Sequence, residues 1–175
     1  MGGRTSLTLA EGMTGMMRTN AVMISHAIRQ KSLKENYKTV KRNKVKTLDE
    51  LEKTLDYHFE DPQLLIEALT HKSYKQPYNN ERLEFLGDAV LRLAASDFIE
   101  SEHPKMSVGE RSALRAQLVS DRWLAELGER CGIEALLHLG PMASGDRAGR
   151  ATVRAECTEA LIGAIYSAWG GSQGG

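Results

Sequence analysis

Residues 81–91 carry an acidic row and an apolar row at the spacing of an α-helix. The acidic row is Glu81, Glu84 and Asp88. The apolar row is Leu83, Leu86 and Val90. A helix places each row on one side, one turn above the next, and suits the apolar row for burial. Stacked like charges repel by roughly a few tenths of a kcal/mol per pair, so the stretch predicts a core helix whose acidic face meets something cationic.

A second acidic pair, Glu156 and Glu159, lies near the C-terminus of the chain, three residues apart. If its helix packs beside residues 81–91, these two carboxylates converge with Glu84 and Asp88. Carboxylate oxygens suit hard cations such as Mg²⁺ or Mn²⁺ rather than zinc. One or two such ions can activate water and stabilise a leaving alkoxide in phosphodiester hydrolysis. Spacing alone leaves open the alternative of solvated acidic faces paired with neighbouring Lys and Arg.

Two further residues of the stretch bear on this choice. Gly87 lies inside the helical pattern, where glycine costs up to about 1 kcal/mol relative to alanine. We therefore expect another part of the chain to approach the backbone at Gly87. Phe85 lies next to the acidic row and off the apolar stripe, and we expect it at or near the surface. An exposed aromatic beside a functional face often anchors a partner, and packing against a neighbouring helix is the alternative.

Charge is unevenly distributed along the chain, although the formal net charge is zero. Residues 1–46 contain ten Lys or Arg and two acids, about +8, so the remainder carries about −8. Such an arm is a candidate for binding a polyanion such as nucleic acid, and a solvated or targeting arm is the alternative. We expect residues 1–20 to be disordered and residues 21–46 to form a loose helix that ends in a charged linker.

Other sequence signals are weaker. Cys131 and Cys157 form no Cys-x-x-Cys pair, and we expect both to be small buried thiols. Glu100 and His103 have the spacing of a di-iron ligand pair, but a proline follows directly and no second pair is present. His71 is expected to be a cap or a hydrogen-bonding group. No apolar run approaches the roughly 18 residues of a membrane span, so we expect no membrane association.

Periods near 3.6 dominate the chain after residue 46, and they predict an all-α fold. Asn80 is expected to cap a central helix that begins at Glu81 and runs to about Glu100. Capping signals predict four other helix starts, at Thr47, Asp61, Ser107 and Ser120. The C-terminal part is expected to hold a short helix at 133–139, a loop at 141–149, a last helix from 151 to about 169, and a frayed tail at 171–175.

Residues 81–91, ERLEFLGDAVL, closely resemble the signature helix of the ribonuclease III family. The other similar blocks, in the family's order and spacing, are Ala68–Tyr74, the Asn-Glu lead-in, Arg115–Ser120 and Glu159–Tyr166. Together the blocks cover about residues 47–170. The resemblance implies an all-helical endonuclease domain over residues 47–170. Such a domain forms a homodimer and uses Mg²⁺ to cut double-stranded RNA, leaving 5′-phosphate and 3′-hydroxyl ends.

The resemblance also implies a set of metal ligands. By position, Glu84, Asp88 and Glu159 correspond to metal-binding acids of the family, and Glu156 stands where the family usually has Asp. Glutamate is one methylene longer, and Mg²⁺ tolerates displaced ligands poorly. Activity is therefore expected to be reduced or to need Mn²⁺ as a substitute.

Three more residues match positions with a role in the family. Glu81 and Glu110 match acids near the scissile strand, so Glu81, Glu110, Asp88 and Glu159 are the catalytic candidates. Phe85 matches an aromatic side chain that inserts into the partner subunit.

The chain departs from the family pattern in a second way, because the sequence stops before the family's C-terminal double-stranded RNA-binding domain. The chain is expected to be a short form of the family or a truncated sequence, or to bind RNA by other means. The basic residues 1–46 are a candidate replacement, with a steep salt dependence of binding expected. The alternative function is a catalytically weak or inactive relative that binds structured RNA or ribosomal particles. We expect a cytoplasmic protein, or an organellar one if residues 1–46 include a transit segment.

Overall fold

A computed structural model of the chain describes residues 45–141, 143 and 147–171, and the expectations for residues 1–44 and 172–175 lie outside this part. The described part is helical, and its single β-bridge, between Thr70 and His138, is isolated. The all-α prediction is therefore confirmed. None of the described helices is long and apolar enough to cross a membrane. The α-helices are α2 (Leu48–Leu55), α3 (Pro62–Leu69), α4 (Glu81–Glu102), α5 (Val108–Leu118), α6 (Asp121–Cys131) and α8 (Arg147–Gly171). Two 3-10 helices lie in the described residues, η2 (Lys72–Tyr74) and η3 (Ile133–Leu136).

The predicted helix starts are confirmed, with one difference at α2. The side chains of Thr47, Asp61, Ser107 and Ser120 each accept a hydrogen bond from a backbone N–H in the first turn of α2, α3, α5 and α6. At Ser107 the capping box is complete, because the Glu110 carboxylate binds the Ser107 backbone N–H. At Thr47 the box is only half formed, since the Glu50 carboxylate accepts from the backbone N–H of Lys46 instead.

Three expectations were wrong in detail. Asn80 occupies the N-cap position of α4, but its side chain makes no capping hydrogen bond. The Asn79 side chain instead accepts from the backbone N–H of Glu81, while Asn80 is fully buried with its amide nitrogen 3.7 Å from the Cys157 sulfur. Residues 133–139 form only the single turn η3, because the chain then extends to pair His138 with the segment after α3. α8 already begins at Arg147, so residues 147–149 are helical rather than part of a loop.

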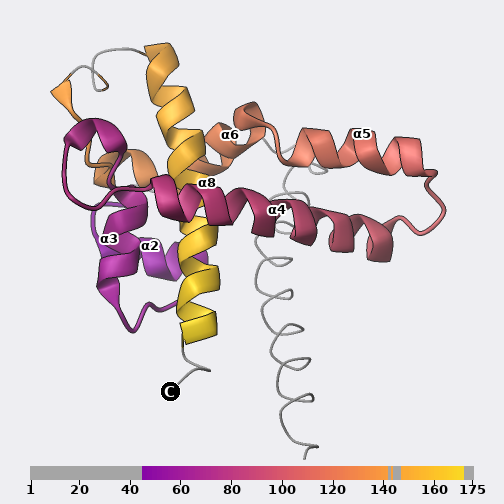
Figure 1. The fold of residues 1–175 in the computed structure, drawn as a ribbon, viewed down its shortest axis with the longest axis horizontal. Coiled ribbons are helices and arrows are strands. Elements are labelled where there is room, and N and C mark those ends of the chain that lie inside the picture. Colours follow the sequence, from indigo (N-terminus) through magenta and orange to yellow (C-terminus); the bar gives the residue numbers. More distant parts are fainter. Residues whose placement is uncertain (1–44, 142, 144–146, 172–175) are drawn as a thin grey trace, which may run out of the picture.

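The core is organised on α8, which α4 crosses near the middle of the molecule (Figure 1). Burying each large apolar side chain contributes about 1.5–3 kcal/mol. One apolar cluster joins α2 and α3 to α8 through Leu51, Leu65, Leu161 and Ile165. A second joins α6 to α4 and α8 through Leu91, Trp123, Leu124 and Ile162. The second half of α4 and α5 extend away from this core (Figure 1).

Two glycines allow α4 and α8 to cross with their backbones in contact. A Cβ atom at Gly87 would lie 2.6 Å from the carbonyl carbon of Glu159 and closer still to its oxygen. A Cβ atom at Gly163 would lie 2.9 Å from the carbonyl carbon of Leu83. The expectation that another segment approaches the backbone at Gly87 is confirmed, and that segment is the turn of α8 that carries Glu159.

Arg154 of α8 ties α6 and η3 to the core. Its guanidinium, mostly buried, donates to the Ala125 carbonyl at 3.0 Å and to the Glu134 carboxylate at 2.6 Å. Hydrogen bonds to charged groups contribute about 1.5–3 kcal/mol each. We expect Arg154→Met, which keeps the aliphatic stem, to lower the free energy of unfolding in urea by about 2 kcal/mol. The control Arg122→Met removes an exposed pair with Glu126 and should change stability little. Equal losses in the two variants would contradict this assignment.

Candidate active site

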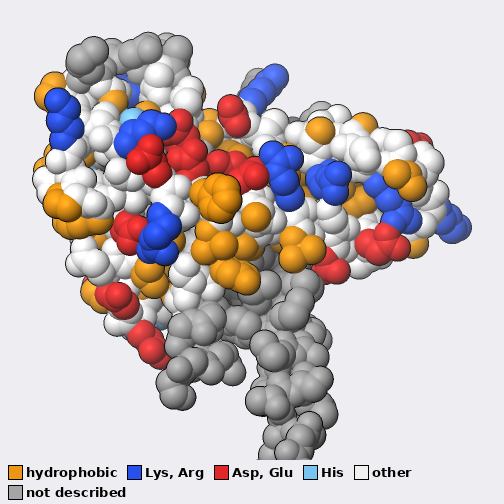
Figure 2. All heavy atoms as spheres, viewed as in Figure 1, with side chains coloured by type: hydrophobic (Ala, Val, Ile, Leu, Met, Phe, Trp, Pro, Cys, Tyr) orange, Lys and Arg blue, Asp and Glu red, His pale blue; other side chains and the backbone are white. Residues whose placement is uncertain are grey.

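Acidic side chains gather over the first half of α4, with Lys and Arg to either side and an apolar patch beside them (Figure 2). α4 contributes Glu84 and Asp88, one turn apart, and α8 contributes Glu156 and Glu159. Because the glycine crossing presses these turns together, the four side chains act electrostatically on one another across the two helices. The crossing therefore brings together the acids that the sequence analysis singled out.

Glu84 is half-buried and incompletely satisfied. Its Oε2 atom is buried without a hydrogen-bond partner. Desolvation, followed by the negative charge of Glu156, raises the pKa of Glu84 above its ordinary value, and Lys72 opposes the shift. A buried carboxylate oxygen with no donor is costly in free energy unless a proton or a cation occupies it.

Glu159 is the most strongly perturbed carboxyl group of the cluster. Burial, followed by the charges of Asp88, Glu84 and Asp121, raises its pKa to about 7, and Arg92 opposes this shift. A carboxyl group with such a pKa is typical of functional sites, where like charges are held together by the fold.

Asp121 belongs to this acidic surrounding, and the sequence analysis missed it. It is the first residue of α6 and raises the pKa of both Glu84 and Glu159. In the sequence it reads only as part of the Ser120-Asp121 helix start, where an acid is ordinary. Its proximity to the other acids follows from the packing of α6 on α8, which no local pattern reveals.

Asp88 and Glu156 each have a cationic or hydrogen-bonding partner. Arg92 Nε lies 2.9 Å from both carboxylate oxygens of Asp88. Glu156 Oε2 lies 3.0 Å from His71 Nε2, and Glu156 Oε1 lies 3.8 Å from Lys72 Nζ. His71 is thus a hydrogen-bonding group, as expected. The four carboxylates thus divide into two that are paired, Asp88 and Glu156, and two whose pKa values are raised, Glu84 and Glu159.

The four carboxylates are the donor set that a metal ion would meet at this site. As the side chains stand, no three acidic, imidazole or thiol groups in the described part of the chain lie close enough together to hold one ion. Two of the four carboxylates are turned toward Arg92 and His71. The chemistry nevertheless fits a hard divalent cation, because all four donors are carboxylates, one oxygen is buried without a partner, and the pKa values of Glu84 and Glu159 are raised by burial and then by mutual repulsion.

Three other predicted site residues, Glu81, Glu110 and Phe85, lie outside the group of four carboxylates. Glu81 begins α4, and its charge contributes to the raised pKa of Glu84. Glu110 lies at the start of α5, where its carboxylate accepts from Ser107 N at 2.8 Å and from Ser107 Oγ at 2.7 Å. Phe85 is 83% exposed, so its expected surface position is confirmed. The roles of these residues remain predictions.

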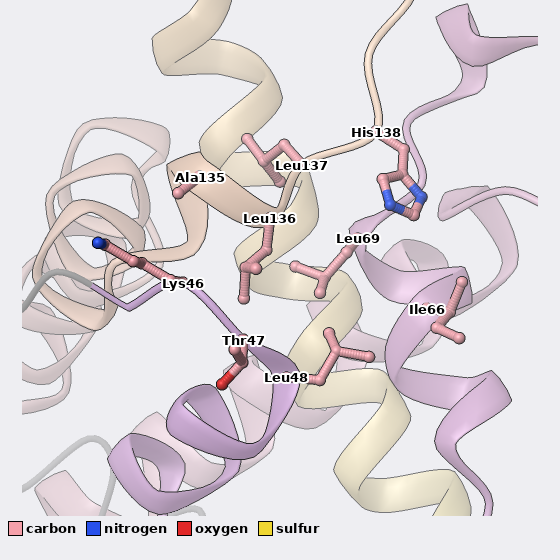
Figure 3. A pocket seen from close by; sticks show the side chains of 9 residues that line it. All are labelled: Lys46, Thr47, Leu48, Ile66, Leu69, Ala135, Leu136, Leu137 and His138. Carbon is pink, nitrogen blue, oxygen red and sulfur yellow. The ribbon is translucent and has the colours of Figure 1, made fainter.

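A pocket of about 380 Å³ lies elsewhere, where the start of α2 meets α3 and η3 (Figure 3). Its lining contains no carboxylate and consists of Lys46, Thr47, Leu48, Ile66, Leu69, Ala135, Leu136, Leu137 and His138. Without acidic ligands this pocket cannot perform the chemistry that the α4–α8 crossing offers.

Comparison with known proteins identifies the family of the chain. A family described as ribonuclease-III-like matches residues 61–174. The chain belongs to this family. A relative named Ribonuclease 3 from Prochlorococcus marinus is 60% identical over 104 residues, which are 59% of this chain and 42% of the relative. Another protein of that name, from Wolinella succinogenes, is 44% identical over 123 residues, which are 70% of this chain and 52% of the relative. The chain thus spans about half the length of these relatives.

Solved structures of the family share the fold. The nuclease domain of ribonuclease III from Campylobacter jejuni is 34% identical and superposes with a TM-score of 0.65, covering 73% of this chain and 94% of that domain. A second structure of the same domain gives a TM-score of 0.64. The first structure was described for structural flexibility in a region involved in dimer formation of that nuclease domain. The chain thus shares the fold of these nuclease domains.

Proposed function

We propose that this chain is a metal-dependent endoribonuclease that hydrolyses phosphodiester bonds of double-stranded RNA during RNA processing, leaving 5′-phosphate and 3′-hydroxyl ends. Residues 47–170 form its catalytic unit. The observation that supports this proposal is the group of carboxylates at the α4–α8 crossing in a chain of the ribonuclease-III-like family. In this group one oxygen of Glu84 is buried without a hydrogen-bond partner, and the pKa of Glu159 is about 7. Mg²⁺ is the cofactor, and Mn²⁺ is its substitute.

The carboxylates would hold the metal, and their neighbours would orient them. Glu84, Asp88, Glu156 and Glu159 are the ligands. The bound ion supplies positive charge that activates water and stabilises the leaving oxygen of the phosphodiester. Arg92 and Lys72 hold the repelling acids together before RNA arrives. Glu81 and Glu110 are the further acids that act near the scissile strand.

Substrate recognition rests on charge and shape. Lys and Arg flank the acidic cluster on the face seen in Figure 2, where they can contact the phosphates on either side of the scissile bond. Duplex RNA is recognised chiefly through its backbone and 2′-hydroxyl groups, so no fixed sequence is required. The basic residues 1–46 add further phosphate contacts, and binding weakens steeply with salt.

The direct test is a cleavage assay on a generic RNA duplex with the full-length chain, in Mg²⁺, in Mn²⁺ and in a chelator. Cleavage with either ion and none with the chelator is expected. A chain starting near Lys46 tests the basic arm, and equal activity would remove the arm from the mechanism. Glu156 in place of aspartate favours one second candidate, a weak relative that binds structured RNA. Duplex binding without cleavage in either ion would establish that candidate and overturn the first.

Metal binding should depend on pH because the cluster holds protons in the metal-free protein. The pKa of Glu159 is raised to about 7, so bound metal must displace a proton from this group at or below about pH 7, and the raised pKa of Glu84 acts in the same direction. The Mn²⁺ affinity of the RNA-free chain should therefore rise between pH 6 and pH 8, most steeply near pH 7. Titration with Mn²⁺ at several pH values, followed by electron paramagnetic resonance of the free ion, measures this. An affinity independent of pH would contradict the assignment of Glu159 as a ligand.

We further propose that the chain forms a homodimer through Phe85, an exposed aromatic beside the active site. Its exposure means that Phe85→Ala should leave the free energy of unfolding of the monomer nearly unchanged. Loss of a central aromatic anchor costs about 2 kcal/mol or more of binding, so the dimer dissociation constant should rise at least about 30-fold. Sedimentation equilibrium tests this, with Val108→Ala as a control of similar exposure on α5. A dimer unaffected by Phe85→Ala would exclude this anchor.

A further inference from the structure

His71 is a buried imidazole that touches the acidic cluster without belonging to it. It lies between α3 and η2 and is only 7% exposed. Its Nε2 atom lies 3.0 Å from Glu156 Oε2, across 85 residues of sequence. Buried polar side chains are nearly always hydrogen-bonded, so this contact is a specific hydrogen bond between His71 and Glu156.

The other ring nitrogen fixes the direction of this hydrogen bond. His71 Nδ1 lies 3.2 Å from the backbone nitrogen of Ser73 and 2.7 Å from its Oγ. A backbone N–H can only donate, so Nδ1 is the acceptor and the ring proton of the neutral imidazole lies on Nε2. Ser73 Oγ accepts from the backbone N–H of Gly140 at 3.0 Å, which leaves its own proton for Nδ1. The chain of donors thus runs from Gly140 through Ser73 and His71 to Glu156.

The backbone holds the imidazole in place. The His71 N–H donates to the His138 carbonyl at 3.1 Å, and the His138 N–H donates to the Leu69 carbonyl at 2.9 Å. Gly140 packs tightly against Ser73, because a Cβ atom there would lie 2.9 Å from the Ser73 carbonyl carbon. His71 is therefore anchored on both sides by main-chain contacts and cannot follow a movement of Glu156.

Glu156 needs such an anchor more than an aspartate would. Glutamate has one more side-chain torsion, and immobilising it costs more rotamer entropy. Lys72 is the other partner of Glu156, but its ammonium lies 3.8 Å away on a side chain that is 47% exposed. A flexible point charge attracts a carboxylate without fixing its orientation. A donor N–H on a rigid ring fixes both the position and the orientation of the carboxylate.

We propose that His71 is a positioning residue: its Nε2–H holds the Glu156 carboxylate in the orientation that a divalent metal ion requires. The inference rests on the proposed function and adds to it a residue that acts on the metal only through Glu156. Partners that orient a ligand in this way typically change metal affinity about 10- to 100-fold when they are removed.

Two near-isosteric substitutions separate positioning from packing. In His71→Gln the amide N–H stands close to the place of Nε2, whereas His71→Asn retains an acceptor for Ser73 and has nothing at that place. Mn²⁺ titration of the full-length chain without RNA should give an affinity about 10-fold weaker for His71→Asn and close to the original for His71→Gln. Urea unfolding of both variants measures the effect on the fold. Equal Mn²⁺ affinities for the two variants and the original chain would overturn the inference.

A double-mutant cycle with Glu156→Ala tests whether His71 acts through that carboxylate. In the Glu156→Ala background, His71→Asn should leave the Mn²⁺ affinity unchanged. An additional 10-fold loss there would show that His71 acts through the fold, and would overturn the inference while leaving the proposed function standing. Failure of the unsubstituted chain to bind Mn²⁺ or to cut duplex RNA would instead overturn the proposed function, and the inference with it.

Discussion

Glu159→Gln is expected to abolish duplex RNA cleavage, with a loss of about 10³-fold or more in the cleavage rate. Metal-based charge stabilisation contributes several kcal/mol to such a reaction, and about 4 kcal/mol corresponds to this factor. Glu159 should show the largest effect of the acids, because it lies on the turn of α8 that touches Gly87 and interacts with Asp88, Glu84 and Asp121. A neutral amide cannot replace its charge toward a cation.

The same substitution should stabilise the metal-free protein at high pH. The pKa of Glu159 is about 7 in the folded chain and near 4.5 in an unfolded one. Between these values the folded state binds more protons, so the stability contribution of this group is complete below about pH 4.5 and is lost as the pH rises to about 7. Glutamine resembles the protonated form. The variant should thus match the original chain in urea at pH 4 and exceed it at pH 8.

This combination of lost cleavage and gained stability distinguishes a functional acid from a structural one. The control is Glu102→Gln, an exposed carboxylate at the end of α4, which should alter neither property. A Glu159→Gln protein that still cuts RNA at more than about a tenth of the original rate would exclude the metal role, because that rate corresponds to a loss of less than about 1.4 kcal/mol. Lower stability of the variant at pH 8 would show that the carboxylate is structurally satisfied.

The sequence singles out α4 as the helix of the candidate active site because α4 violates a local rule. Glycine is unfavourable inside a helix, and Gly87 lies in the middle of an otherwise well-formed apolar stripe. The structure explains this exception through the backbone of α8. The acidic residues on one face are a similar exception. They repel one another, and the fold holds them close together although it partly buries Glu84 and Glu159. Such conflicts between local sequence preference and the fold are common at functional sites.

The features that the sequence did not reveal depend on contacts between distant segments. Asp121 lies at a helix start and His71 follows a helix, both ordinary local positions. Only tertiary packing brings Asp121 to the acidic cluster and gives His71, expected as a hydrogen-bonding group, its partner Glu156. Asn79 and Asn80 are equally good caps by type. Burial of Asn80 against Cys157 decides between them, and that contact spans 77 residues. Long-range packing overrides local preference in each of these cases.

Gly87→Ala is expected to be the most destabilising small substitution in the described part of the chain. The added methyl group would collide with the main chain of α8 at Glu159, and no side-chain rotation can relieve a clash with backbone. Overpacking costs about 1–3 kcal/mol when side chains can adjust and more when they cannot. Alanine regains up to about 1 kcal/mol of helix propensity. We expect a net loss of about 3 kcal/mol in the free energy of unfolding in urea.

Gly109→Ala is the matched control, since it makes the same chemical change in α5, where a Cβ atom would meet nothing within 4 Å. Its stability should be unchanged or slightly higher. Gly163→Ala should resemble Gly87→Ala, because its methyl group would meet the Leu83 carbonyl at the same crossing. The double variant should lose less than the sum of the two single losses, since the helices are already separated by the first methyl group. Fully additive losses would mean that the two glycines do not share one contact.

The consequence for activity follows from the same geometry. Separating α4 from α8 moves Glu84 and Asp88 away from Glu156 and Glu159. Metal ligands must be held within about 0.5 Å of the productive geometry. The fraction of Gly87→Ala protein that remains folded should therefore bind Mn²⁺ more weakly and cut RNA more slowly than the original chain. Retention of full Mn²⁺ affinity in the folded variant would show that the metal needs the acids of one helix only. The glycine crossing would then serve the fold and not the active site.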